Sequence, residues 1–230
     1  MDILTDEHER EEAVRKWWHE HWKSIALGVT IALAGLVGVR QYQAYQLSED
    51  QKTAYEVYQL QKQISTQGVN AMSNAQAFLD QHKDAFGAIL ALDMANAQIS
   101  AKNYVEAEKF ASFAAANGGD LIAPQASIIK ARLLTQDGKT DEALKTLDSI
   151  KSTAYKAEVA ETRGDIYMSL NDRANARTAY LDAINTNKAD KIQISPMLQL
   201  KFDNVIVEGD TPAYKIVAEQ AKEMSAVSAQ

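Results

Sequence analysis

The most distinct feature of the hydrophobic pattern is an uncharged run from Ser24 to Val39, bounded by Lys23 and Arg40. Most of its residues are Ile, Leu, Val, Ala or Gly. A helix needs about 20 residues to cross the ~30 Å hydrocarbon core of a bilayer, and flanking cations can bury their stems while their charges stay in water. The pattern predicts a single membrane-spanning helix over residues 23–40, with the lipid bilayer as a partner.

Aromatic residues stand at both ends of this run. Trp17, Trp18 and Trp22 precede it, and Tyr42 and Tyr45 follow it, which is the placement typical of the two membrane–water interfaces. A secretory signal peptide would have a basic start and a small-residue cleavage site. The first 22 residues instead hold seven acidic and three basic side chains, so we expect an uncleaved anchor.

The basic residues near the ends of the run predict its orientation. Four lie on the N-terminal side and two at a comparable distance on the C-terminal side: Arg10, Arg15, Lys16 and Lys23, against Arg40 and Lys52. Because Lys and Arg are enriched on the cytoplasmic side, residues 1–22 are predicted to form a cytoplasmic tail. The larger C-terminal part then lies across the membrane, in the periplasm of a Gram-negative cell.

Small residues recur at helical spacing along the predicted span. They are Ser24, Gly28, Ala32 and Gly35, called here the small-residue face. Small side chains let a second helix approach closely, although Gly and Ala are frequent in membrane helices generally. This face is a candidate contact with a helix of a membrane partner.

Beyond residue 40 the pattern is helical, with no strand-like alternation, and it repeats. Small residues recur at intervals of 36 and 33, at Ala95, Ala131 and Gly164. Further members of the repeat follow twelve and sixteen residues later: Ala107, Ala143 and Ala176, then Ala111, Leu147 and Tyr180. Such a period indicates stacked helix–turn–helix units. The predicted fold class is all-α, with an N-terminal single transmembrane helix followed by a helical-hairpin solenoid.

The unit around Gly164 resembles the tetratricopeptide repeat (TPR) in spacing and residue type. The matching residues are Gly164, Tyr167, Ala176, Tyr180 and Ala183. Lys188 stands where a Pro often closes the repeat, and Gln98 replaces an aromatic residue one unit earlier. We therefore expect a TPR-like domain over residues 41–206, followed by a C-terminal helix and frayed tail at 207–230.

Turn and cap residues mark the expected helix boundaries. Gly138 is suited to end one helix and Thr140 to cap the next. Pro124, Pro196 and Pro212 each fit the first turn of a helix, the last two after Ser195 and Thr211 as caps.

Composition and motifs argue against catalysis. A net charge of −7 and the lack of a basic patch predict no nucleic-acid partner, and the chain has no cysteine. Gly138-Lys139-Thr140 resembles the end of a phosphate-binding loop, but Leu133 stands where the motif needs its first Gly. His19 and His21 lie two residues apart, so they point to different sides of a helix. We expect no enzyme, no catalytic, cofactor-binding or metal-binding residue, and no cofactor.

The repeat register predicts a groove lined by the first helix of each unit. Its expected lining residues, called here the groove set, are Ile89, Leu92, Asn96, Ile128, Arg132, Glu161, Asp165 and Met168. They are suited to an extended client or a partner helix. For Ile89 and Leu92 the alternative is coverage by the chain's own segment from Lys52 to Ile64. Replacing Arg132 by Glu and Asp165 by Lys is expected to weaken partner binding without lowering the melting temperature.

The layout as a whole resembles the YfgM family, ancillary subunits of the bacterial SecYEG translocon, over residues 8–206. The segments that carry the resemblance are EAVRKWWHEHWKSIALGV, DAFGAILALDMA and DEALKTLDSIKSTAYKAEVAETRGDIYMSLNDRANARTAYLDAI. The resemblance implies an inner-membrane protein with a periplasmic TPR domain that associates with SecYEG and the membrane-anchored chaperone PpiD. It also implies a role in passing unfolded, newly translocated client proteins to periplasmic chaperones.

Two other functions stay open at this point. The protein could be a scaffold for another membrane complex, with its TPR domain in the cytoplasm. It could also be a stress-response regulator that acts through its acidic cytoplasmic tail, a role that the family resemblance also implies.

Overall fold

The computed structural model describes residues 3–207 together with Lys215 and Ala218, and every element in residues 3–207 is helical. It divides into two compact units, Met1–Tyr55 and Glu56–Gln230. The all-α prediction is confirmed for this part of the chain. Of the C-terminal segment expected at 207–230, with Pro212, all residues but Val207, Lys215 and Ala218 lie outside the described part of the chain.

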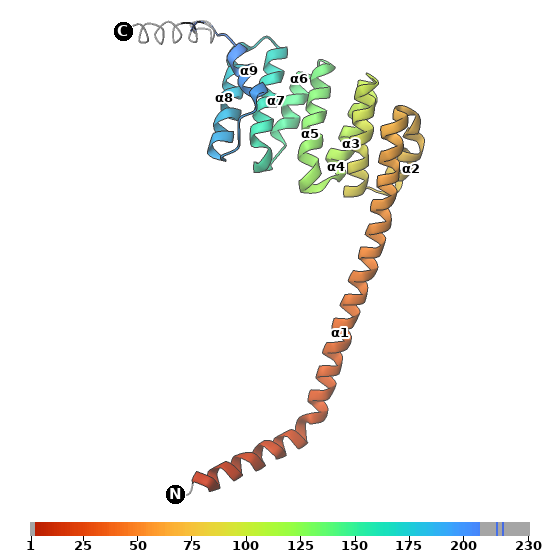
Figure 1. Ribbon diagram of the computed structural model, residues 1–230, viewed down its shortest axis with the longest axis vertical. Coiled ribbons are helices and arrows are strands. Elements are labelled where there is room, and N and C mark those ends of the chain that lie inside the picture. The colour runs from red at the N-terminus through yellow and green to blue at the C-terminus, as the bar shows by residue number, and fades with distance from the viewer. Residues whose placement is uncertain (1–2, 208–214, 216–217, 219–230) are drawn as a thin grey trace, which may run out of the picture. The chain divides into compact units, whose positions relative to one another are not determined.

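Helix α1 is a single helix of 65 residues, Ile3–Gln67 (Figure 1). It contains no Pro, and the Thr30 hydroxyl donates to the Ala26 carbonyl at 2.7 Å, so that this polar group is paired inside the apolar stretch. Within the described part of the chain, it is the one helix that is long and apolar enough to cross a membrane, and its apolar window is not buried at all. The helix ends before Gly68, which has a left-handed φ of 57°.

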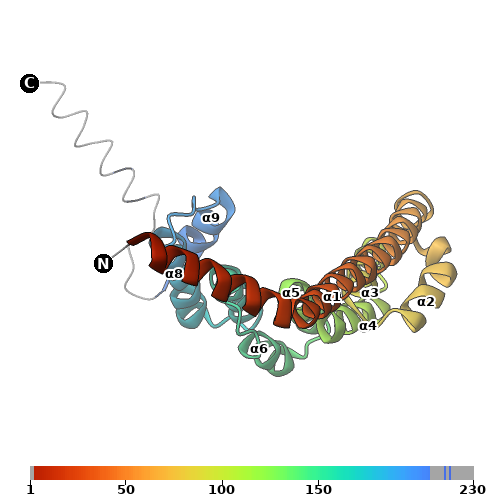
Figure 2. The ribbon, with the colours of Figure 1, turned by 90° about the horizontal axis from the view of Figure 1, so that it is seen from below.

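The second unit is a row of helical hairpins (Figure 1). Its elements after α1 are the 3₁₀ turn Gly68–Ala71, α2 (Met72–Gln81), α3 (Ala85–Ser100), α4 (Tyr104–Asn117), α5 (Gly119–Gln136), α6 (Thr140–Asp148), the 3₁₀ turn Thr153–Tyr155, α7 (Lys156–Ser169), α8 (Arg173–Ala189) and α9 (Pro196–Asn204). Helix α5 packs against both α3 and α7, while α4, α6 and α8 pair with them. The row curves, with α4 and α6 on its outer side (Figure 2).

The same turn closes the first helix of three successive hairpins. Lys102, Gly138 and Asn171 have left-handed φ values of 61°, 77° and 57°. In each turn the next residue donates its backbone N–H to a carbonyl five residues back, at 2.8 to 2.9 Å. This is the hydrogen bond of a Schellman helix end. The predicted helix end at Gly138 is confirmed, and the turns repeat at the intervals of 36 and 33 that the small residues have.

The repeat positions form the core. Ala95, Ala131, Ala107, Ala143, Ala176, Ala111, Leu147 and Tyr180 are all at most 2% exposed, and Gly164 is also buried. Small residues at the crossings let the paired helices approach. In the second and third units the larger Leu147 and Tyr180, sixteen positions on, fill the remaining space. The predicted repeat is confirmed.

Two of the predicted helix starts are wrong. Pro124 lies inside α5, because that helix already begins at Gly119. Thr140 is the first residue of α6, and the capping position is Lys139, since the left-handed Gly138 brings the chain into the helix one residue earlier. By contrast, the cap at Ser195 is confirmed: its hydroxyl accepts from Leu198 N at 3.1 Å, with Pro196 in the first turn.

Candidate partner-binding surfaces

The small-residue face is open along α1. Ser24, Gly28, Ala32 and Gly35 are all exposed, and a Cβ built on either glycine meets nothing within 4 Å. Helical spacing places the four on one side of the span. A partner helix could approach this side to backbone distance.

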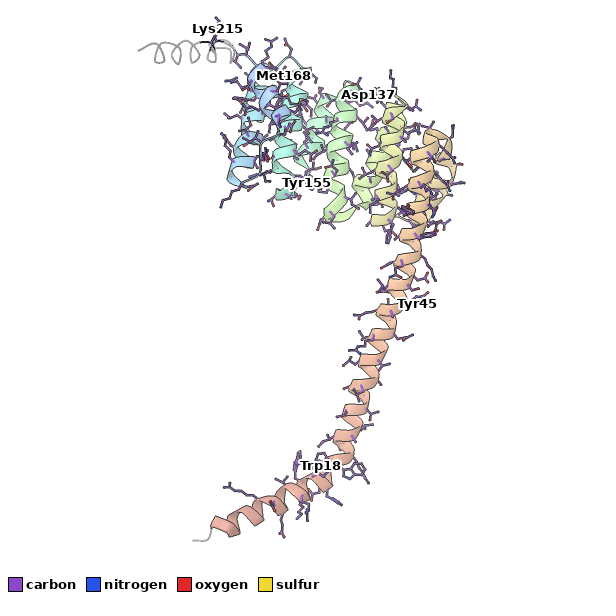
Figure 3. The ribbon with its side chains drawn as sticks, in the orientation of Figure 1. Trp18, Tyr45, Asp137, Tyr155, Met168 and Lys215 are labelled. Carbon is purple, nitrogen blue, oxygen red and sulfur yellow. The ribbon has the colours of Figure 1, made fainter. Side chains whose placement is uncertain are left out.

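The groove set is only partly brought together. Its members lie on α3, α5 and α7, the helices expected to line the groove. Asn96 and Arg132 are exposed, and Met168 is 38% exposed. Met168 lies near the end of α7, on the same side of the array as Asp137 in the turn after α5, and far from Tyr155 (Figure 3).

Ile128 is not a surface residue, so its expected place in the groove is wrong. Its side chain is fully buried in a cluster formed by α5, α6 and α7. The cluster consists of Ile128, Ala131, Leu134, Ala143, Leu147 and Ile166. The repeat register predicts the helix of Ile128 correctly. In the structure, however, its side chain lies at the contact with the next hairpin and not on the open side of the array. It has no surface to offer a partner.

The end of α1 packs on the first helix of the array. Val57, Leu60 and Ile64 share a buried cluster with residues of α3, and Leu92 packs partly buried against this cluster. Gln61 Nε2 donates to Asp93 Oδ2 at 2.6 Å. Coverage by the chain's own helix therefore holds in part for Leu92, whereas Ile89 stays 39% exposed.

A cleft of mixed character follows this contact. Its volume is ≈ 690 Å³, and it is lined from α1 by Tyr58, Gln61 and Ser65 and from α3 by Asp93 and Asn96. The remaining lining residues are Lys62, Ile64, Gly68, Ala97 and Ser100. The lining therefore combines hydroxyl and amide groups with one cation, one carboxylate and apolar side chains, and can offer hydrogen bonds and charge contacts to a peptide.

At the other end of the array, the chain's own helix α9 pairs with two residues of the groove set. Lys201 of α9 donates from Nζ to Glu161 Oε1 and to Asp165 Oδ2, both at 2.8 Å. The hydroxyl of Tyr180 donates to the second oxygen of Asp165, also at 2.8 Å. The side chains of Lys201, Glu161, Asp165 and Tyr180 are together called here the α9 clasp. Any partner for Glu161 or Asp165 must displace or extend it.

The α9 clasp shifts two pKa values. Burial raises the pKa of the Tyr180 hydroxyl, and its hydrogen bond to the Asp165 carboxylate raises it further. Burial alone would lower the pKa of the Lys201 ammonium, but the hydrogen bonds to Asp165 and Glu161 outweigh it, so the net direction is upward. Both groups therefore hold their protons across the neutral range.

Arg132 also has partners within the array. Its Nη2 donates to Thr162 Oγ1 at 3.1 Å and lies 3.5 Å from Glu158 Oε1. Thr162 is completely buried, so this bond satisfies a hydroxyl that would otherwise be costly to bury. Arg132 links α5 to α7 while its side chain keeps 46% of its surface exposed.

Sequence reasoning missed Lys201, the residue that organises the clasp. A signal for it was present, because Glu161 and Asp165 are four residues apart and share one side of α7. Two carboxylates in this arrangement favour a cation that pairs with both, and Lys201 lies in the helix whose start was expected at Pro196. The residue was not identified because nothing in the sequence sets the rotation of α9.

The described residues show no grouping of three or more His, Asp or Glu side chains that could hold a metal ion. The α9 clasp is an ion-pair network of the repeat itself and includes a protonated amine. The small-residue face, the exposed residues of the groove set and the cleft can bind a partner through hydrogen bonds, ion pairs and apolar contacts.

Stacked hairpins that cross at small residues, with α3, α5 and α7 in one row and α4, α6 and α8 paired to them, define an α-solenoid of the TPR type. The chain belongs to the family of the tetratricopeptide repeat-like domain, whose model matches residues 15–207.

Relatives confirm the resemblance found from the sequence. The ancillary SecYEG translocon subunit of Escherichia coli (strain K12) is 27% identical over 209 residues, covering 90% of this chain and 100% of that protein. The protein of the same name from Aggregatibacter actinomycetemcomitans is 27% identical over 210 residues, covering 89% and 100%. Among solved structures, the crystal structure of MamA aligns with a TM-score of 0.48 and 16% identity, over 63% of this chain and 84% of that chain.

Proposed function

We propose that this protein is an inner-membrane TPR adaptor of the Sec translocon that helps pass newly translocated proteins to periplasmic chaperones, with no catalysis of its own. The proposal rests on one observation, which is that two features occur in the same chain. An exposed apolar stretch long enough to cross a bilayer lies in α1, and the end of the same helix enters the core of a TPR array. The names of the full-length relatives supply the partner.

The proposed topology follows the distribution of basic residues. Residues 1–22 form the cytoplasmic tail, 23–40 the anchor and 41–206 the periplasmic TPR-like domain, with 207–230 as the C-terminal segment. Four basic residues before the span against two after it support a cytoplasmic N-terminus.

Two surfaces are proposed to divide the work of binding. The small-residue face contacts a helix of SecYEG, because its glycines leave room for close approach. On the array, the exposed Asn96, Arg132 and Met168 contact a client segment or a PpiD-like membrane-anchored chaperone. Glu161 and Asp165 take part only when a partner displaces or extends the α9 clasp. Ile128 is excluded because it is buried.

The topology is tested first, by protease digestion of intact spheroplasts that carry a C-terminal tag on the protein. Digestion from outside supports the periplasmic domain. Survival of the tag until the membrane is lysed would show a cytoplasmic domain, provided that the lysed control is cleaved. The scaffold for a different membrane complex would then replace the adaptor.

The translocon contact is tested by crosslinking from single cysteines. The chain has no cysteine, so variants at Gly28, Ala32 and Gly35 report from one position each. Matched controls at Leu33 and Val37 lie on the opposite side of the helix. Crosslinks to translocon helices from the first set and not from the second support the proposal. Equal crosslinking from both sets would show mere proximity.

Deleting residues 1–12 separates the adaptor from the regulator. Translocon crosslinking that survives the deletion fits the adaptor. Loss of an envelope-stress response with unchanged crosslinking would instead assign the tail a regulatory role.

A further inference from the structure

The part of α1 that precedes the apolar stretch carries an exposed aromatic face. Val14, Trp17, Trp18 and Trp22 are 66%, 53%, 54% and 45% exposed. Their spacing of three, four and eight residues places them on one side of a helix. His21 lies within this arc and packs edge-on against Trp17, with ring centroids 5.3 Å apart. These five residues are called here the aromatic face.

The opposite side of the same segment is polar and mainly basic. Between residues 13 and 23 the charged side chains are Arg15, Lys16, Glu20 and Lys23, and all four are exposed. Arg15 borders the aromatic face, while Lys16 and Lys23 lie across the helix from it. The segment before it is acidic, with Glu11 and Glu12 as its last residues.

The aromatic face leads directly into the apolar stretch. Trp22 is followed by Lys23 and then by the run from Ser24, with no break in α1. The helix changes direction close to Trp18, so that the preceding turns do not continue the axis of the apolar stretch (Figure 3). When the stretch crosses a bilayer, a segment that leaves its axis at this point stays at the membrane surface rather than projecting from it.

We infer that residues 13–23 bind the surface of the membrane as an interfacial helix, with the aromatic face among the lipids and Arg15, Lys16 and Lys23 on anionic phospholipid headgroups. The inference rests on the proposed anchor. Lipid is the occupant favoured because the face is continuous with the lipid-crossing stretch, and because its aromatic residues are of the type enriched at the headgroup level. The covalent link to the anchor holds the segment at high local concentration beside that surface.

The charge pattern makes this binding selective. Basic residues beside a membrane favour anionic lipids, whereas the acidic residues ahead of the segment are repelled by them. The contact should therefore end near Ala13, and residues before it should stay in water. Selection for anionic headgroups distinguishes this segment from a purely apolar anchor.

The chain offers a specific probe, because its three tryptophans all lie in this segment. The full-length protein is reconstituted in vesicles of phosphatidylcholine alone or mixed with phosphatidylglycerol, and tryptophan emission is recorded. Lipids brominated at shallow or deep acyl positions then quench the emission. We expect blue-shifted emission that is quenched more by shallow than by deep bromines, and more so in the anionic vesicles.

The basic residues are tested by Arg15→Gln and Lys16→Gln, with exposed Lys145→Gln in the repeat domain as the matched control. Arg15→Gln and Lys16→Gln should each lower the ratio of lipid-bound to free segment in anionic vesicles roughly fivefold. This factor corresponds to the attraction of about 1 kcal/mol between one basic residue and an anionic membrane surface. The control should leave the ratio unchanged.

The outcomes separate this inference from the anchor. Protein that floats with the vesicles but has red-shifted emission, open to a water-soluble quencher, overturns the interfacial helix and keeps the anchor. Protein that does not float overturns the anchor itself. Emission that shifts only when translocon is reconstituted alongside also overturns the inference, because the aromatic face would then bind protein.

Discussion

A methyl group on Gly164 would lie 2.4 Å from Cε1 of Tyr180, whose ring fills the crossing of α7 and α8. At the same two positions the first unit has Ala95 and Ala111, and the second unit has Ala131 and Leu147. Among the three pairs, the smallest first residue, Gly164, faces the largest second residue, Tyr180. Each unit therefore fills its helix crossing with a different pair of side chains.

Replacing Gly164 by Ala should lower stability although Ala is the better helix former. The gain in helix propensity is about 1 kcal/mol, whereas forcing a methyl group against a buried ring costs roughly 1–3 kcal/mol and displaces a side chain that is hydrogen-bonded to Asp165. We expect a net loss, measured as a lower midpoint of chemical unfolding.

The same substitution should become harmless when Tyr180 is Leu, because the crossing then has the Ala and Leu pair of the preceding unit. A double-mutant cycle measures this coupling, with Ala131 and Leu147 as the native example of the pair. Equal losses in both backgrounds would show that the ring is not the cause.

Lys201→Met should release α9 from the array. The substitution removes two hydrogen bonds to carboxylates and leaves Glu161 and Asp165 facing each other without their cation. For partly exposed groups we expect a loss of roughly 1–2 kcal/mol, which corresponds to about 2–8 °C in melting temperature for a domain of this size. Exposed Lys145→Met is the control, and an equal shift in both variants would contradict a specific clasp.

The clasp also changes what Asp165→Lys can test. From the sequence we expected that Asp165→Lys, combined with Arg132→Glu, would not lower the melting temperature. The structure predicts a loss of stability for Asp165→Lys, because a second cationic group would meet Lys201 and the Tyr180 hydroxyl would lose its acceptor. Asn96→Ala and Met168→Ala are better probes of client binding, since both side chains are exposed. They should weaken crosslinking to a client and leave the melting curve unchanged. Unchanged crosslinking would count against the groove.

Stability should fall in alkaline solution through the same clasp. The folded pKa values of Tyr180 and Lys201 lie above their usual values, so the folded state keeps protons that the unfolded state releases. The contribution of these two groups to the free energy of unfolding is complete below about pH 10, where the groups begin to titrate in the unfolded state. It is lost as the pH rises through their folded pKa values. The decline in melting temperature above about pH 10 should be smaller in a Tyr180→Phe, Lys201→Met variant than in the parent.

Asp84→Ala should weaken the start of α3. The Asp84 carboxylate accepts from the backbone N–H groups of Phe86 and Gly87 at 2.9 and 3.1 Å. Loss of such a cap costs about 1 kcal/mol. Asp84→Asn, which can still accept both bonds, should retain most of the stability in the same unfolding measurement. Equal losses for Ala and Asn would point to charge rather than capping.

The repeat could be predicted because its small residues are local and periodic. Ala95, Ala131 and Gly164 are needed wherever two helices cross, and the turns at Gly138 and Asn171 require residues that tolerate left-handed φ. The equivalent turn at Lys102 could not be predicted, because lysine is not a residue type that favours left-handed φ. The hydrogen bonds at the helix end impose this conformation.

The proposed binding surface was less predictable, because it depends on rotation about each helix axis. A rotation of one residue separates the exposed Arg132 from the buried Ala131, and Ile128 falls on the buried side of the same helix. The α9 clasp depends on a contact between residues 36 and 40 positions apart, which helical spacing alone cannot supply.

The burial of Val57, Leu60 and Ile64 beneath α3 has a consequence for how this protein could be released from its membrane. A protease cut before Glu56 would shed an intact soluble domain. A cut within the next few turns would remove part of the domain's own interior. The segment between Arg40 and Tyr55 is exposed throughout except for Thr53, so it is the stretch in which shedding, or the exchange of one anchor for another, leaves a domain able to fold.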